Sequence, residues 1–150
     1  MDAPRRIIVG VDGSEDSGRA LDWAVALMEG RRMEGSDGEI IAVHVLGLLT
    51  HLGGTTIVPS ETHRGEVTEL LEHEWCRPLA SSRVPYRALV VDGEPVHALM
   101  AAAREQAADL IVVGRRGAGG SLGPLIGSTS QQLVHQAVFP IVVVPPESAP

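Results

Sequence analysis

A set of short aliphatic runs, almost free of charge, constrains the fold of this chain more than any other feature of its sequence. Each run is four to seven residues long, rich in valine and isoleucine, and continuous rather than alternating between apolar and polar residues. Continuous runs of this length predict strands that are buried on both faces. Four runs show the pattern clearly and a fifth shows it more weakly: Ile7–Val11, Ile40–Leu46, Leu110–Val113, Ile141–Val144 and, as the weaker one, Arg87–Val91.

The segments between these runs carry helical patterns. Apolar residues recur there at helical spacing, and Pro95 stands in a first turn, where its missing N–H does no harm. Strands that alternate with helices predict right-handed crossovers and a parallel sheet. The predicted helices run from Asp16 to about Gly30, from Glu61 to Leu79, from Glu94 to about Ala107 and from Ser128 to about Ala137.

The connection Gly47–Ser60 is the one long loop in this arrangement. Its glycines, threonines and scattered apolar residues suggest a mobile flap or a partner-contact segment rather than a domain boundary. A length of 150 residues is typical of one domain, and the sequence contains no linker or low-complexity tract. We therefore predict a single α/β domain over residues 1–150, with Pro145-Pro146 ending the regular structure.

The charged residues exclude several classes of function. A formal net charge of −7 argues against a nucleic-acid-binding protein, because phosphate backbones are held by clustered positive charge. All 12 basic residues are arginines. Without lysine, the chain has neither a Schiff-base nucleophile nor a Walker-type phosphate-binding loop.

The sequence predicts a cytoplasmic protein that does not enter a membrane. Its single cysteine, Cys76, has no internal disulfide partner, which fits a reducing compartment. Asp12 interrupts the first apolar run too early for a signal peptide. No stretch approaches the roughly 20 apolar residues of a membrane span.

Three glycine-containing loops follow predicted strands: Val11–Ser14, Asp92–Pro95 and Gly114–Ser130. Open parallel sheets bind ligands beyond the carboxyl ends of their strands. The third loop has six glycines ahead of a helix that opens with Ser128-Thr129. Flexible backbone N–H groups, a helix N-terminus and two hydroxyls together make a phosphate cradle. The alternative is a surface loop with an ordinary serine N-cap, and composition alone leaves both open.

The glycine spacing differs from two familiar phosphate-binding patterns. The dinucleotide pattern G-x-G-x-x-G should follow the first strand, where this chain has Gly10-Val11-Asp12-Gly13, and the Walker pattern needs a lysine. The chain instead has Gly114-x-x-Gly117, nine residues, and then Gly127-Ser128.

This G-x-x-G-x9-G-[ST] arrangement after the fourth strand resembles the ATP-binding signature of the universal stress proteins, and it stands intact as GRRGAGGSLGPLIGS. The segments IIVGVDGSEDSGRALDWA, AVHV and GSTSQQLVHQAVFPIVVVPP resemble other parts of that family. The likeness covers nearly the whole chain and is weakest from about Gly47 to Arg83.

The resemblance implies a five-stranded parallel sheet in the order 3-2-1-4-5 with helices on both faces, the adenine nucleotide alpha hydrolase-like fold. It implies a homodimer through the last strand, Pro140 to Val144, an apolar edge of the kind that tends to associate. It also implies bound ATP, with Mg²⁺ on the phosphates. The nucleotide-binding residues would be Gly10, Asp12, Val45 and Val113 around adenine and ribose, Gly114 beside the ribose, and Gly117, Gly127, Ser128 and Thr129 at the phosphates.

Several charged residues near these loops have alternative roles. Asp12 would serve as a ligand residue or cap the first helix. Arg115 and Arg116 would clamp phosphates or remain solvated. Asp92 and Glu94 would pair with Arg116 or hold a metal through water, although we favour helix capping for both.

The histidines and tryptophans are expected to be structural. His73-x-x-Cys76 lacks a second pair of ligands at metal-site spacing, so we expect no zinc there. The remaining expectations are His44 as a satisfied strand residue, His97 and His135 at the surface or in caps, and Trp23 and Trp75 packing helices onto the sheet.

The leading hypothesis is an ATP-binding stress-response regulatory protein, in which nucleotide occupancy modulates contacts within a dimer or with an unknown protein partner. Asp12 is expected towards the base end of the nucleotide, and no general base is identified for hydrolysis. The alternatives are a slow ATPase or phosphoryl transferase that uses Asp92 or Glu94, and an interaction module without nucleotide.

Overall fold

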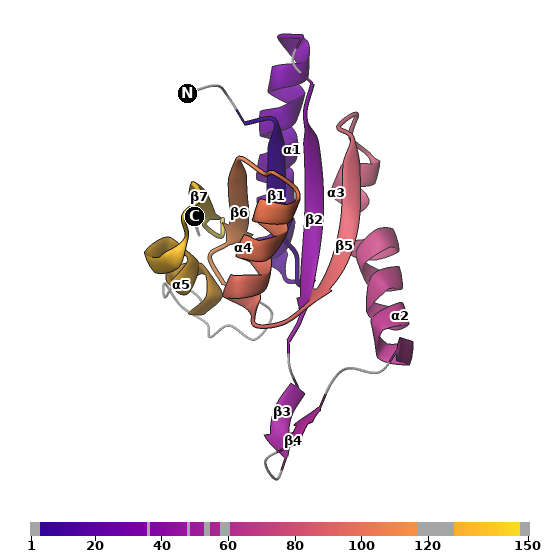
Figure 1. Ribbon diagram of the computed structural model, residues 1–150. Helices are drawn as coiled ribbons and strands as arrows, with labels where there is room; N and C mark the ends of the chain where they lie inside the picture. Colours follow the sequence, from indigo (N-terminus) through magenta and orange to yellow (C-terminus); the bar gives the residue numbers. More distant parts are fainter. Residues whose placement is uncertain are drawn as a thin grey trace.

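A computed structural model describes residues 4–35, 37–47, 49–52, 55–57, 61–116 and 128–147. Residues 49–52 and 55–57 are described by their backbone alone. Strands and helices alternate along most of the chain (Figure 1). The elements are β1 (Arg6–Gly10), α1 (Glu15–Met33), β2 (Glu39–Leu46), β3 (Leu49–Leu52), β4 (Thr55–Ile57), α2 (Glu61–Leu70), the π-helical turn η1 (Leu71–Trp75), α3 (Arg77–Ala80), β5 (Tyr86–Asp92), α4 (Pro95–Glu105), β6 (Leu110–Gly114), α5 (Ser128–Gln136) and β7 (Ile141–Val144).

The main sheet confirms the predicted fold class. Its five strands run parallel in the order β5-β2-β1-β6-β7, which is 3-2-1-4-5 when only the strands of this sheet are counted. β1 lies at the centre, where Ile8 pairs with Ile41 of β2 on one side and Ile111 of β6 on the other. β7 lies at one edge and pairs with β6.

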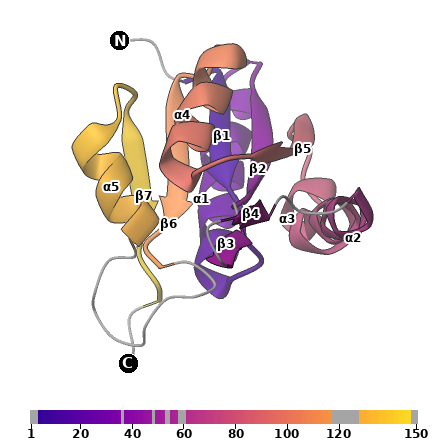
Figure 2. The same cartoon turned by 60° about the horizontal axis from the view of Figure 1, so that its bottom comes forward.

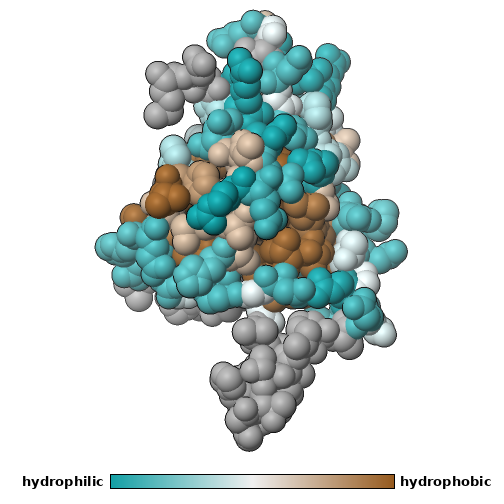
Figure 3. All heavy atoms as spheres, viewed as in Figure 1, coloured by the Kyte–Doolittle hydropathy of each residue, from teal (hydrophilic) through white to brown (hydrophobic). Residues whose placement is uncertain are grey.

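Two apolar layers explain why the strand sequences are continuous rather than alternating. Ile7 and Val9 of β1 belong to the cluster beneath α1, whereas Ile8 belongs to the cluster beneath α4, so successive residues are buried on opposite faces. α1 lies behind the sheet and α4 in front of it (Figures 1 and 2). Beside α4 the front layer stays partly open, and apolar surface is visible there over β2 and β5 (Figure 3).

The segment that we expected to be a long loop contains a β-hairpin. β3 and β4 pair antiparallel, with Leu49 opposite Ile57 and Leu52 opposite Thr55, and form a separate two-stranded sheet. The ribbon extends away from the main sheet beyond the end of β2 (Figures 1 and 2). Paired glycines between short segments of leucine, threonine and isoleucine are a hairpin pattern. The prediction of a structureless connection over Gly47–Ser60 was therefore wrong for this part.

The predicted helix Glu61–Leu79 is not continuous. α2 passes into the π-helical turn η1, and a new short helix, α3, starts with Pro78 in its first turn. A proline in that position lacks the N–H that would continue the preceding ladder. The wider turn is closed by a hydrogen bond of 3.0 Å from Cys76 N to Leu71 O, and both of these residues are fully buried.

Candidate functional site

The chain reverses direction across the sheet between β1 and β6. From β1 it goes outward to β2 and β5, and then returns to the other side of β1 as β6 and β7. The carboxyl ends of β1 and β6 therefore form a topological switch point, which is where open parallel sheets bind ligands. The loops after β1 and β6 are the ones in which we predicted most of the site residues.

The loop after β1 is braced by Asp12. The Asp12 carboxylate accepts hydrogen bonds from Ser14 N at 2.9 Å and from Ser14 Oγ at 2.5 Å. Ser14 Oγ in turn accepts from Ser17 N at 3.1 Å and is the N-cap of α1. Ser14, rather than Asp12, therefore caps the helix, and Asp12 fixes the conformation of the loop that leads into it.

The same loop packs against an aromatic pair. Gly13 has a positive φ of 81°, and a Cβ there would lie 2.7 Å from Cε2 of the Trp75 indole. The Trp75 ring lies 5.2 Å from the ring of His44, measured between centroids. His44 Nδ1 is 2.7 Å from Val11 O, so His44 is a satisfied strand residue, as predicted. Glycine is required at position 13 both by the backbone conformation and by the close indole.

Three of the predicted base-side residues lie on the α4 face of the sheet. Val45 and Val113 both pack against the cluster beneath α4, and Gly10 ends β1 between their strands. A Cβ on Gly10 would lie 3.2 Å from Val113 Cγ1 and 3.5 Å from Leu99 Cδ1. The missing side chain lets these neighbours close over the end of β1.

The segment after β6 is fixed by contacts with three other elements. Arg115 N donates to Val144 O of β7 at 3.0 Å, and Arg115 O accepts from Ser130 Oγ of α5 at 2.7 Å. Arg116 N donates to the Asp16 carboxylate of α1 at 3.0 Å. Gly114 lies so close to α1 that a Cβ would be 2.5 Å from the carbonyl carbon of Asp16.

These contacts hold the two ends of the glycine-rich loop together. Ser128 and Thr129 stand in the first turn of α5, as predicted, and Ser130 in the same turn is buried and bonded to Arg115. We did not predict a role for Ser130 from the sequence, although the run Ser128-Thr129-Ser130 offered a third hydroxyl in that turn. Gly117 and Gly127 lie outside the described residues.

Charges at this edge are arranged differently from the expectation. Arg116 pairs with Asp16 through Nε at 3.4 Å, and Asp92 pairs with Arg64 at 2.5 Å rather than with Arg116. Glu94 is the N-cap of α4, as favoured, and accepts from two backbone N–H groups. The helix-capping role that we favoured for Asp92 is wrong, because Glu94 caps α4 and Asp92 forms an ion pair with Arg64.

Arg115 carries an unusual buried donor. Its Nε is buried and has no hydrogen-bond partner, and it is the one such side-chain atom within the described residues. A buried unpaired donor is costly, and a guanidinium N–H is suited to an anionic acceptor.

His73 and Cys76 differ in their exposure. His73 is exposed whereas Cys76 is fully buried, and within the described ranges no three potential ligands gather into a metal-binding group. Burial, with a smaller contribution from the Glu72 carboxylate, raises the pKa of the Cys76 thiol to about 11, so this thiol stays protonated and unreactive at neutral pH.

Trp75 packs against the core beneath α1, as expected, but Trp23 was assigned wrongly. Its side chain is 37% exposed and belongs to neither of the two apolar clusters. His97 and His135 are both exposed, and His97 lies 3.4 Å from Glu94.

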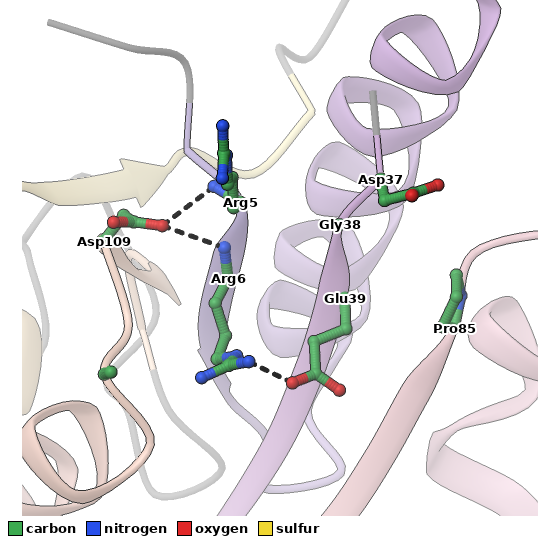
Figure 4. A pocket seen from close by; sticks show the side chains of 8 residues that line it. Arg5, Arg6, Asp37, Gly38, Glu39, Pro85 and Asp109 are labelled. Carbon is green, nitrogen blue, oxygen red and sulfur yellow. Dashed lines mark hydrogen bonds and ion pairs between the residues drawn. The ribbon is translucent and has the colours of Figure 1, made fainter. Parts of the chain in front are cut away.

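A separate depression of about 510 Å³ lies at the opposite, amino edge of the sheet (Figure 4). Several of its polar groups bind one another: the Asp109 carboxylate accepts from the backbone groups Arg5 N and Arg6 N, and Arg6 Nε lies 2.7 Å from Glu39. These contacts tie the starts of β1, β2 and β6 together. The depression is therefore accounted for by strand anchoring, and it is remote from the loops after β1 and β6.

The fold is that of an open parallel α/β protein, with braced loop ends at the switch point of its sheet. A family model described as "Universal stress protein family" matches residues 4–145, and the chain belongs to that family. The universal stress protein YxiE of Bacillus subtilis is 30% identical over 93% of this chain and 97% of its own length.

Solved structures resemble the chain at the level of the fold. A universal stress protein in complex with cAMP has 24% identity and a TM-score of 0.69, and the likeness covers 95% of this chain and 98% of the other. An Arabidopsis thaliana family protein with AMP bound has 21% identity and a TM-score of 0.64, over 97% and 94% of the two chains. Within the described residues, no helix is long and apolar enough to cross a membrane.

Replacing Gly114 by alanine tests the contact between β6 and α1. The added Cβ meets the backbone of Asp16, so we expect a loss of about 1–3 kcal/mol in the free energy of unfolding, the range typical of overpacking. Urea denaturation measures this change. Gly18→Ala is the matched control, because a Cβ at Gly18 meets nothing within 4 Å; equal stability of the two variants would contradict the packing account.

Proposed function

We propose that the protein binds an adenine nucleotide, ATP with Mg²⁺ in the first instance, across the loops that follow β1 and β6. The observation that carries the proposal is the fixed base of the glycine-rich loop, where Arg115, Arg116 and Ser130 are held by neighbouring elements. A loop with anchored ends and many glycines can bring its backbone N–H groups close to a phosphate. The buried, unpaired Nε of Arg115 adds a donor that suits an anion.

The division of the site is the one that the family resemblance implies. Gly10, Asp12, Val45 and Val113 would surround adenine and ribose, with Gly114 beside the ribose. Relatives of similar fold with cAMP or AMP bound support an adenine nucleotide as the class of ligand. The phosphate-binding residues would be Gly117, Gly127, Ser128 and Thr129.

The role of the nucleotide is regulatory in this proposal. Asp16 is held by two arginines, Asp92 by Arg64, and Glu94 by the N-terminus of α4, so these three carboxylates are committed to structural contacts. A general base must reach the group from which it takes a proton. Nucleotide occupancy would instead change contacts with a partner in a cytoplasmic stress response, and slow hydrolysis remains the alternative.

We propose a homodimer through β7 as the first such contact. β7 is an apolar edge strand, and its outer side carries backbone groups that face away from β6. The hydrogen bonds at Pro140 O and Val144 O face β6, so the intervening Val143 N–H faces outward because successive residues alternate.

Gly127→Val tests the nucleotide site. A branched side chain at this position of the motif would keep the backbone away from a phosphate, so we expect the affinity for Mg-ATP to fall at least about tenfold with the fold unchanged. Isothermal titration measures the affinity, and circular dichroism checks the fold. Gly65→Val is the control, because a Cβ at Gly65 meets nothing within 4 Å. An unchanged affinity of Gly127→Val would refute the phosphate role.

Val143→Pro tests the dimer. Proline removes the outward N–H and spares the bonds to β6, so we expect a monomer where the unmodified protein is a dimer, as measured by light scattering. Val134→Ser is the control, because Val134 is an exposed apolar residue that belongs to α5 and not to β7. If Val143→Pro stays dimeric and Val134→Ser dissociates, the interface lies on α5 instead.

A further inference from the structure

We infer that Asp16 is the positioning residue of the glycine-rich loop: its buried carboxylate sets where that loop leaves the sheet, and thereby sets the affinity for the phosphate part of the nucleotide. The inference rests on the proposed function and assigns to it a residue outside the glycine signature. Asp16 lies in the first turn of α1, and its side chain is 7% exposed.

The Asp16 carboxylate joins two segments that are 100 residues apart in the sequence. Its Oδ2 accepts a hydrogen bond from Arg116 N at 3.0 Å, and Arg116 Nε lies 3.4 Å from the same oxygen. Its Oδ1 accepts from Arg19 Nη1 at 2.9 Å. Arg116 directly precedes Gly117, the second glycine of the signature, so the bond acts at the first residue before the loop.

The surroundings make this position of the carboxylate rigid. Two arginines offset the cost of burying its charge, and the N-terminus of α1 favours a negative group in its first turn. The backbone of Asp16 is also pressed against Gly114, which leaves no room for α1 to shift towards β6. The charge-assisted hydrogen bond that Arg116 N donates to this fixed carboxylate therefore holds Arg116 N in one place.

The same helix turn belongs to the loop after β1. Ser14, two residues before Asp16, caps α1. Ser14 is in turn held by the carboxylate of Asp12. Asp16 thus fixes the glycine-rich loop relative to the loop that carries Asp12. Three of the four proposed base-side residues, Gly10, Val45 and Val113, lie on the α4 face, so we expect loss of the Asp16 bond to weaken phosphate contacts much more than base contacts.

The test compares two ligands, ADP and adenosine, which differ in the phosphates alone. For Asp16→Ala we expect the affinity for ADP to fall about tenfold or more, as for the loss of a hydrogen bond to a charged group, while the affinity for adenosine stays within about twofold. Asp16→Asn keeps an acceptor oxygen for Arg116 N and should recover part of the ADP affinity. Isothermal titration of the full chain gives both affinities, and the ratio between them is the readout.

Glu15→Gln is the matched control. Glu15 is in the same turn and lies 3.8 Å from Arg19, but its side chain is 91% exposed and makes no contact with Arg116 in the described structure. Its ADP-to-adenosine ratio should equal that of the unmodified protein.

The outcomes separate the two proposals. Suppose that the unmodified protein binds ADP. If Asp16→Ala then lowers the affinities for ADP and adenosine equally, or lowers neither affinity, the positioning role is wrong while nucleotide binding stands. If the unmodified protein binds neither ligand, the proposed function fails and the positioning role fails with it. Should Asp16→Ala not fold, the ratio measured for Asp16→Asn decides: an unchanged ratio overturns the inference and a lowered ratio supports it.

Discussion

The first turn of α1 lies against the end of β6 with no side chain between them, and the rest of the candidate site depends on that contact. It requires glycine at position 114, because a Cβ there would lie within 2.5 Å of the Asp16 backbone. Once the two elements are this close, the carboxylate of Asp16 reaches Arg116 N, and the segment after β6 is tied to α1. The packing of α1 against β6 therefore also determines the position of the segment that leads into the glycine-rich loop.

The second loop is fixed by a different kind of interaction. Trp75 is carried by the π-helical turn η1 and packs against the backbone of Gly13, while His44 contacts Val11 O from β2. Asp12 completes the bracing by holding Ser14, the cap of α1. The loop after β1 is thus supported by two neighbouring elements, and π-helical turns often occur at functional positions. Both loops begin from rigid bases, which is the arrangement that a preorganised binding site needs.

Much of the fold could be predicted from the sequence because its strands are buried on both faces. Continuous runs such as Ile40–Leu46 have few other structural solutions, and their alternation with helices fixes a parallel sheet. The order of the strands was implied by the resemblance to the family, and the structure confirms it. The helix starting at Glu94-Pro95 was also predictable, because the cap and the proline act within one turn.

The errors fall where tertiary contacts decide. Arg64 and Asp92 are far apart in the sequence, so nothing local indicates that they pair. Trp23 has a side chain typical of a core residue, but it belongs to neither apolar cluster and is 37% exposed. The hairpin of β3 and β4 is a different case, because the leucines and threonines around two glycines are themselves a local hairpin pattern.

The bond from Arg116 N to Asp16 shows the same limit within the candidate site. The two residues are 100 positions apart, and Asp16 reads as an ordinary acidic residue in the first turn of a helix. Only the folded chain brings it to the base of the glycine-rich loop. The signature glycines can be recognised from the sequence, whereas the residues that hold the loop in place cannot.

Isothermal titration of the nucleotide-stripped protein with Mg-ATP is the most direct test of nucleotide binding. We expect saturable binding close to one nucleotide per chain, because each chain carries its own pair of braced loops. A folded sample that shows no heat of binding with Mg-ATP, ADP or AMP would contradict the proposal of nucleotide binding. The braced loops would then serve an interaction module that works without a nucleotide.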